Sequence, residues 1–128
     1  VELAAPPATV WRWLTEPELT ERYWGGTRIE STWRPGDTIL YRRAGAITDE
    51  HVILAIEAPR LLVHSFHPVS GELRDEAPSR VRILLQDAPR GTRLALRHDG
   101  FPADSLVYPA CVQGWPEILE ALRAALDS

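Results

Sequence analysis

Apolar residues near both ends of the chain recur with the spacing of α-helices. Near the start, Val10, Trp11 and Leu14 follow Pro6-Pro7, and a proline is well tolerated in the first turn of a helix. A second short helix is predicted to begin at Thr15, because Glu18 three residues later would complete a capping box. Near the end of the chain, one helical stripe is formed by Trp115, Ile118, Leu119, Leu122 and Leu126.

Between the helical segments, apolar and polar residues alternate with the period of β-strands. Strands are predicted at 28–33, 38–43, 47–57, 61–67, 79–87 and 92–99, after the end of another strand at 1–4. The turn at 34–37 has Pro followed by Gly, the pattern of a type II turn. Since the strands follow one another in hairpins and the helices stand apart, the pattern predicts one antiparallel α+β domain over residues 1–128.

The same alternation assigns faces to the predicted strands. Val81, Ile83 and Leu85 share one face, and the following strand points Leu94, Leu96 and His98 inward. The inner face of the strand at 61–67 cannot be assigned in this way, because both of its faces mix apolar and polar residues. One face has Leu62, His64 and Phe66, and the other has Leu61, Val63, Ser65 and His67. Its register stays open. The C-terminal helix should begin or kink near Gly114 and Pro116 and cover the apolar face of the sheet.

Composition excludes several function classes. The 128 residues include 14 basic side chains, all of them arginine, and the formal net charge is -4, which argues against a nucleic-acid partner. The lack of lysine excludes Schiff-base chemistry and a P-loop. No apolar run approaches the length of a membrane span. Cys111 is the one cysteine, so an internal disulfide is excluded; we expect a small buried thiol in a cytoplasmic protein.

Polar residues of the catalytic and metal-binding types are present, but their spacing is unfavourable. His64 and His67 lie three apart on one strand, which places them on opposite faces. His98 and Asp99 are adjacent and face apart as well. The acidic pairs Asp49-Glu50 and Asp75-Glu76 are typical of solvated surface. We therefore expect no metal, no other cofactor and no catalytic residue.

Aromatic residues are the richest candidate set. Of the five tryptophans, Trp11 and Trp115 fit a core. Trp13 points to another face of its helix and is a candidate for a partner surface. Trp24 and Trp33 flank the first strand of the main sheet, where they would line a cavity mouth or a dimer contact.

Several segments, taken in order, resemble a known superfamily. They are residues 5–18 (APPATVWRWLTEPE), 23–26 (YWGG), 33–36 (WRPG), 96–101 (LRHDGF) and 114–119 (GWPEIL). This series resembles the START-like, or SRPBCC, superfamily, in particular the branch related to activators of the heat-shock chaperone ATPase. The resemblance implies a helix-grip fold: a curved seven-stranded antiparallel sheet around a long C-terminal helix, with two short helices between strands 1 and 2.

The resemblance further implies a hydrophobic cavity between sheet and helix, and some members are dimers. Functions in the superfamily range from lipid carriage to polyketide cyclisation and chaperone assistance, so the fold alone does not define the activity. The matching motifs are structural and carry no catalytic residue with them.

We expect this chain to bind a small hydrophobic or amphipathic molecule without catalysis. The candidate ligand-binding residues are Tyr41, His64, Phe66, Leu96, His98, Tyr108 and Trp115.

Two other functions stay open. An enzyme, a cyclase or hydrolase, would need a polar pair inside the cavity, such as His64 with Tyr41 or Tyr108. A protein-interaction or chaperone-assisting module would expose an aromatic patch with Trp13 or Trp24. A homodimer is also expected, with an exposed aromatic from Tyr23-Trp24 or Trp33 in its interface.

Overall fold

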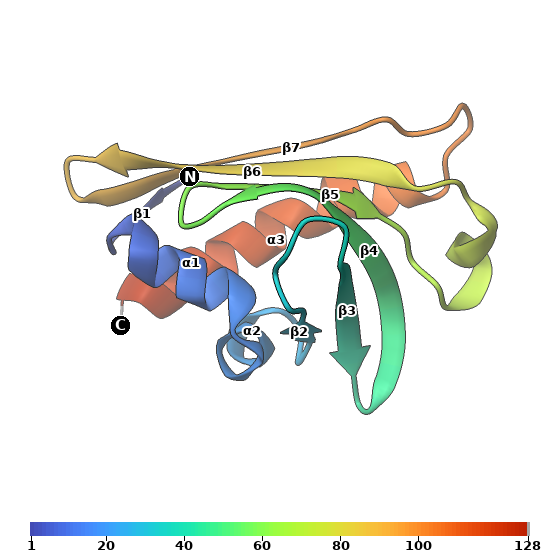
Figure 1. The fold of residues 1–128 in the computed structure, drawn as a ribbon, viewed down its shortest axis with the longest axis horizontal. Coiled ribbons are helices and arrows are strands. Elements are labelled where there is room, and N and C mark those ends of the chain that lie inside the picture. The colour runs from blue at the N-terminus through green and yellow to red at the C-terminus, as the bar shows by residue number, and fades with distance from the viewer. Residues whose placement is uncertain (128) are drawn as a thin grey trace.

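A seven-stranded antiparallel sheet curves around one long helix (Figure 1). The computed structural model describes residues 1–127. The strands lie in the order β1-β7-β6-β5-β4-β3-β2. Their bounds are β1 Glu2–Leu3, β2 Arg28–Glu30, β3 Thr38–Arg43, β4 Ala46–Glu57, β5 Leu61–Phe66, β6 Ser79–Ala88 and β7 Gly91–Asp99. The predicted α+β helix-grip architecture is confirmed.

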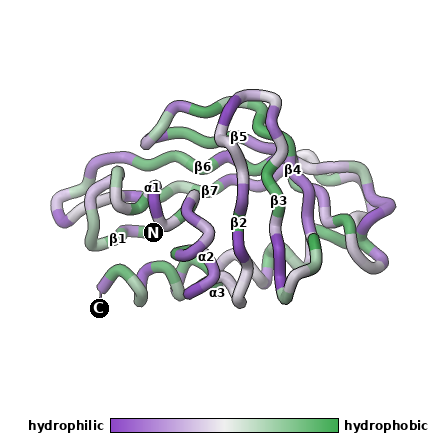
Figure 2. Tube along the Cα trace, turned by 60° about the horizontal axis from the view of Figure 1, so that its bottom comes forward, coloured by the Kyte–Doolittle hydropathy of each residue, from purple (hydrophilic) through white to green (hydrophobic). Residues whose placement is uncertain are grey.

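Three α-helices accompany the sheet. Two short ones, α1 (Pro7–Thr15) and α2 (Pro17–Tyr23), lie between β1 and β2, as expected, and α3 (Val107–Asp127) is the long C-terminal helix. In Figure 2, α3 runs along one side of the curved sheet, and hydrophobic residues recur along its length. No helix among residues 1–127 is both long and apolar enough to cross a bilayer.

The predicted capping box of the second helix is wrong. Thr15 is the last residue of α1, and its hydroxyl donates a 2.8 Å hydrogen bond to the Trp11 carbonyl. The residue before α2 is Glu16, whose side chain makes no capping bond. It pairs instead with Arg12 at 2.8 Å. Pro17 at the first helical position removes one N–H that a cap would have served.

The first hairpin is also shorter than predicted. β2 ends at Glu30, because Trp33 adopts a left-handed backbone conformation with φ of 59° that interrupts an extended chain. The turn that follows has the predicted type II features: Gly36 has φ of 84°, and the Asp37 N–H donates to the Arg34 carbonyl at 3.0 Å.

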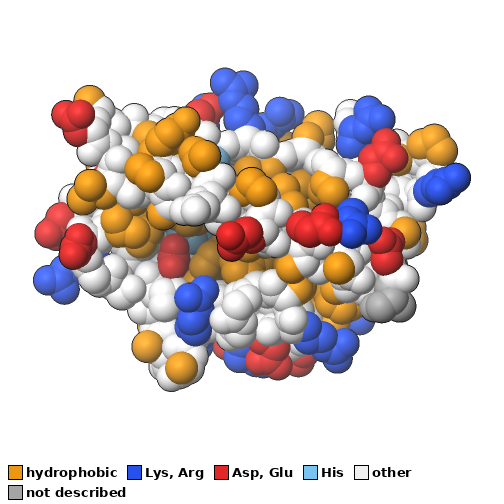
Figure 3. Space-filling view, turned by 180° about the vertical axis from the view of Figure 1, so that it is seen from behind, with side chains coloured by type: hydrophobic (Ala, Val, Ile, Leu, Met, Phe, Trp, Pro, Cys, Tyr) orange, Lys and Arg blue, Asp and Glu red, His pale blue; other side chains and the backbone are white. Residues whose placement is uncertain are grey.

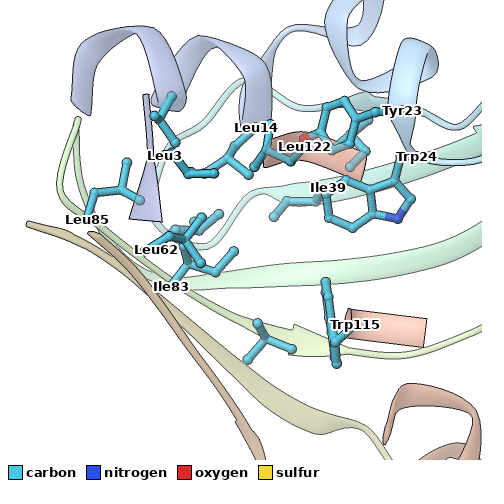
Figure 4. Close-up of a cluster of buried hydrophobic side chains, with 14 of the residues drawn as sticks. Leu3, Leu14, Tyr23, Trp24, Ile39, Leu62, Ile83, Leu85, Trp115 and Leu122 are labelled. Carbon is cyan, nitrogen blue, oxygen red and sulfur yellow. The ribbon is translucent and has the colours of Figure 1, made fainter. Parts of the chain in front are cut away.

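The concave face of the sheet supplies the core. Val81, Ile83, Leu85 and Leu94 are buried there, as the alternation predicted. On β5, Leu62 and His64 are the buried residues, which settles the register that the sequence left open. Figure 4 shows Leu62, Ile83 and Leu85 of the sheet in one cluster with Trp115 and Leu122 of α3. The helical stripe predicted at the C-terminus therefore packs against the sheet.

The long helix begins seven residues before Gly114, at Val107. Its first turn is held by Glu76, which lies just after a short 3-10 helix, Gly71–Asp75. One Glu76 carboxylate oxygen accepts the N–H groups of Leu106 and Val107 at 2.7 and 3.3 Å. The Ser105 hydroxyl accepts the N–H of Tyr108 at 3.0 Å. These bonds satisfy donors that a helix start leaves free, so α3 extends over the curved end of the sheet.

Candidate functional site

A half-open cavity of about 460 Å³ lies between the first half of α3 and the curved strands β3 and β4. The segment between β5 and the 3-10 helix, with Pro68 and Ser70, borders one end of it. Gly114 gives it room on the helix side, because a Cβ added there would meet nothing within 4 Å. On the face shown in Figure 3, apolar side chains gather in the middle, and a row of charged side chains of both signs runs between them.

Three of the predicted ligand-binding residues line this cavity: Tyr41, Phe66 and Trp115. Trp24 joins them, with its ring edge-on to both Tyr41 and Trp115 at centroid distances of 5.7 Å. Tyr41 and Trp115 are themselves buried. Edge-to-face packing of this kind fixes the rings, so the cavity has a preformed aromatic wall.

The other four predicted residues lie elsewhere. His64 is buried behind the wall, with Nδ1 2.6 Å from the Ser65 carbonyl oxygen. Leu96 is half-buried and packs against the core. Tyr108 is 52% exposed and stands edge-on to Phe101 at the start of α3. The suggested catalytic pairing of His64 with Tyr41 or Tyr108 has no hydrogen bond among residues 1–127.

His98, the fourth, acts on the cavity through Trp115. The Trp115 indole N–H donates to His98 Nδ1 at 3.0 Å, so Nδ1 is an acceptor and the ring proton sits on Nε2. That nitrogen lies 2.7 Å from the Ser79 hydroxyl. Burial lowers the pKa of His98 to about 4, which keeps the ring neutral. His98 therefore holds the orientation of the Trp115 indole.

His51 is the functional candidate that sequence reasoning missed. It is fully buried on β4, and its ring packs on Phe66 and edge-on to Tyr41, each at 4.6 Å between centroids. His51 Nδ1 accepts the His67 backbone N–H at 2.8 Å. Its Nε2 makes no hydrogen bond and lies 3.5 Å from a carboxylate oxygen of Asp49. Period-two alternation from the buried Ile53 back along β4 would have signalled this shared inner face.

Asp49 was predicted to be solvated surface, and the structure corrects this. Its side chain is 14% exposed and lines the cavity. Burial raises the pKa of Asp49, while Thr48, Arg43 and His67 oppose that rise. Only Glu50, its neighbour in sequence, is exposed. The pair divides because successive strand residues face opposite sides of the sheet.

Cys111 lines the cavity from α3 as a half-buried free thiol. Burial raises the pKa of Cys111 to about 11, so the sulfur is protonated at neutral pH and is a weak nucleophile. Residues 1–127 also hold no cluster of three or more His, Cys, Asp or Glu side chains arranged for a metal ion.

The aromatic residues proposed for a partner surface are mostly covered. Tyr23 and Trp24 are buried in the core, so the expectation that they are exposed is wrong. The Tyr23 hydroxyl donates to the Trp13 carbonyl at 2.7 Å, which ties α2 back onto α1. Arg22 lies over the Trp13 ring at 5.8 Å. Trp33 is half-buried against the core.

Comparison with known proteins places this fold in a family. The sequence pattern of the family described as "Activator of Hsp90 ATPase homolog 1-like protein" matches residues 4–127. The chain belongs to this family. It lies within the START-like superfamily that the sequence motifs indicated. Among curated proteins, no match was found.

Solved structures agree with this family. Protein MLL2253 from Mesorhizobium loti is 26% identical, with a TM-score of 0.81 over 99% of this chain and 93% of that one. The Aha1 dimer from Colwellia psychrerythraea is 16% identical, with a TM-score of 0.78 over 98% and 91% of the two chains. PFC0360w, an HSP90 activator from Plasmodium falciparum, is 18% identical, with a TM-score of 0.78 over 97% and 90%. The last two show the shared fold alone.

Proposed function

We propose that this member of the family binds a small apolar or amphipathic molecule in the cavity between α3 and the sheet, without altering it chemically. The observation that carries the proposal is the cavity itself. Its volume of about 460 Å³ falls in the range of small-molecule sites. Aromatic rings form its wall, and a few polar groups, including Arg43 and Asp49, border it. This combination suits a ligand with an apolar body and one polar end.

Binding is favoured over catalysis by the groups available. The Cys111 thiol is protonated, and His64 and His98 are neutral side chains engaged in structural hydrogen bonds. A general base needs a titratable group within reach of the substrate; neither of these histidines lines the cavity, and Asp49, which does, has no hydrogen-bonded histidine or tyrosine beside it among residues 1–127.

Filling the cavity from the helix side tests the proposal. Replacing Gly114 with Leu should weaken binding of the fluorescent probe 1-anilinonaphthalene-8-sulfonate at least about tenfold, because the new side chain occupies the space of the ligand. The fold should survive, since leucine favours a helix more than glycine does. Fluorescence titration measures the affinity, and thermal melting checks the fold.

A matched control is Gln113→Leu, which adds the same side chain at an exposed position one residue away. It should leave probe affinity unchanged. Equal affinity in wild type and Gly114→Leu would show that the probe binds elsewhere and would remove this cavity as the site. Native mass spectrometry of the purified wild type can then identify a copurified molecule.

Chaperone assistance is the second candidate, and the family description supports it. A specific feature favours a protein contact. The start of α3 exposes three large apolar side chains, Leu106, Tyr108 and Val112, at 60%, 52% and 56%. Exposed apolar groups that cluster mark interaction surfaces. Measuring the ATPase rate of an Hsp90 with and without this protein, and with Tyr108→Ser, distinguishes the two functions.

We also propose a homodimer in the cytoplasm. The Colwellia relative forms a dimer, and Trp33 remains as a half-buried aromatic at the region first considered for the interface. Cys111 as a free thiol suits a reducing compartment. Sedimentation should show a species of twice 14.4 kDa. A single 14.4 kDa species across a wide concentration range would rule the dimer out.

A further inference from the structure

One side of the cavity has a polar pair of residues that the burial of an apolar ligand does not explain. It consists of Asp49 and His51, two residues apart on β4 and on the same face. Asp49 reaches the cavity, and His51 lies fully buried behind it. We infer that this Asp49–His51 pair recognises a hydroxyl group on the ligand, so that the natural ligand is a flat, neutral aromatic molecule with a phenolic or enolic hydroxyl. This inference rests on the proposed binding function.

The tautomer of His51 is fixed by its surroundings. Because Nδ1 accepts the His67 backbone N–H at 2.8 Å, the proton of the neutral ring is on Nε2. That N–H has no hydrogen-bond partner among residues 1–127, although Nε2 is buried. Asp49 Oδ2 lies 3.5 Å from this nitrogen. A buried donor left unpaired is costly, so the proximity of this N–H favours the ionised, acceptor form of the Asp49 carboxyl.

His51 cannot turn to another partner. Its ring stacks on Phe66 and His64 at centroid distances of 4.6 and 5.1 Å, and Tyr41 stands edge-on to it at 4.6 Å. Burial and the neighbouring histidines also keep the pKa of His51 well below its usual range, so the ring stays uncharged. The pair is therefore not an ion pair of imidazolium and carboxylate.

The carboxylate is short of partners. The described residues place no arginine within ion-pair distance of Asp49, and the hydroxyl of the adjacent Thr48 donates to the Tyr41 carbonyl at 3.4 Å. The Arg43 guanidinium, whose charge lowers the pKa of Asp49, donates to the Thr27 hydroxyl at 3.0 Å. A mostly buried carboxylate with spare acceptor capacity, at the edge of an aromatic cavity, is complementary to a donor brought by the ligand.

Arg43 decides against a cationic ligand. Arg43 lines the same cavity, and its positive charge lowers the pKa of Asp49 through an electrostatic interaction. A cation seated on Asp49 would be repelled by Arg43, whereas a neutral hydroxyl would not. Trp24, Phe66 and Trp115 offer flat faces and edges to the ligand body, which favours an aromatic one.

Matched probes test the inference. Equilibrium dialysis measures the affinity of the wild-type protein for 2-naphthol and for 2-methoxynaphthalene, which has the same ring but no donor. We expect the naphthol to bind about ten- to a hundredfold more tightly, the usual range for a charge-assisted hydrogen bond in a partly buried site. Asp49→Asn should remove most of this difference by weakening the naphthol alone. Glu50→Gln, the same change at the exposed neighbour, should change nothing.

The outcomes separate this inference from the proposed function. Equal affinity of the two probes in the wild type, or an equal loss of both in Asp49→Asn, overturns hydroxyl recognition while the cavity remains a binding site. Tighter binding of protonated 2-naphthylmethylamine than of 2-naphthol overturns the neutral ligand class. Binding of none of the three probes overturns the proposed function itself. The wild-type comparison is decisive even if Asp49→Asn does not fold.

Discussion

Acidification from pH 7 to pH 4 should destabilise the protein strongly, because three histidines are buried without charge. Burial lowers the pKa of His64 and of His98 to about 4, and it lowers that of His51 well below 6.5. In the unfolded chain these rings take up protons near pH 6.5. Between pH 6.5 and 4 the unfolded state thus binds more protons, so the free energy of unfolding falls as the pH falls.

The slope of this fall measures how many histidines contribute. Each one adds about 1.4 kcal/mol per pH unit within the window, and His64 alone accounts for about 3 kcal/mol over its full range. Asp49, whose pKa burial raises, acts in the opposite direction above pH 3.8, at the acidic end of the same window. Urea unfolding at pH 7, 5.5 and 4.5 gives the slope. His64→Phe should reduce this slope by the contribution of one histidine, about 1.4 kcal/mol per pH unit. If the free energy of unfolding of the wild type does not change between pH 7 and pH 4.5, the histidines are not the cause.

Replacing Trp115 with Ala should cost about 3–5 kcal/mol of unfolding free energy. The indole is 9% exposed and forms part of both the core and the cavity wall. Its removal leaves a hole next to Trp24 and Phe66 and leaves His98 Nδ1 without its donor. For a chain of this length the thermal midpoint should fall by about 10 °C or more.

Trp115→Phe separates packing from the hydrogen bond. It keeps a ring in the core and loses the indole N–H, so it should cost about 1–2 kcal/mol. A melting shift near zero for Trp115→Ala would mean that α3 does not pack on the sheet through this residue. A loss in Trp115→Phe as large as that in Trp115→Ala would assign the stability to the bond with His98.

The strands of the sheet could be predicted because their signals lie within the strands and turns themselves. Alternation placed Val81, Ile83 and Leu85 inward, and the 34–37 turn carries its own signal in Pro and Gly. The start of α3 was not predictable in this way. Its first turn is held by Glu76, about thirty residues earlier in the chain, while Gly114 and Pro116 give a strong and misleading break signal.

In the candidate site too, some residues could be placed from local sequence patterns and others could not. Tyr41, Phe66 and Trp115 could be placed from strand faces and a helical stripe. Alternation from Ile53 places Asp49 and His51 on the inner face, but their place beside the cavity depends on neighbours distant in sequence, such as Phe66 and Trp115. A sequence shows two adjacent acids at 49–50; only the fold reveals that one of them lies against a buried imidazole.

The hydrogen bonds between Glu76 and the start of α3 connect this helix to the segment that lines the cavity. Glu76 follows the segment whose Ser70 and Leu73 border the opening, and its carboxylate holds the N–H of Leu106. A ligand that displaces this segment as it enters or leaves the cavity should also weaken the hydrogen bond between Glu76 and the Leu106 N–H. We therefore expect the amide hydrogen of Leu106, immediately before α3, to exchange faster with solvent when this segment moves.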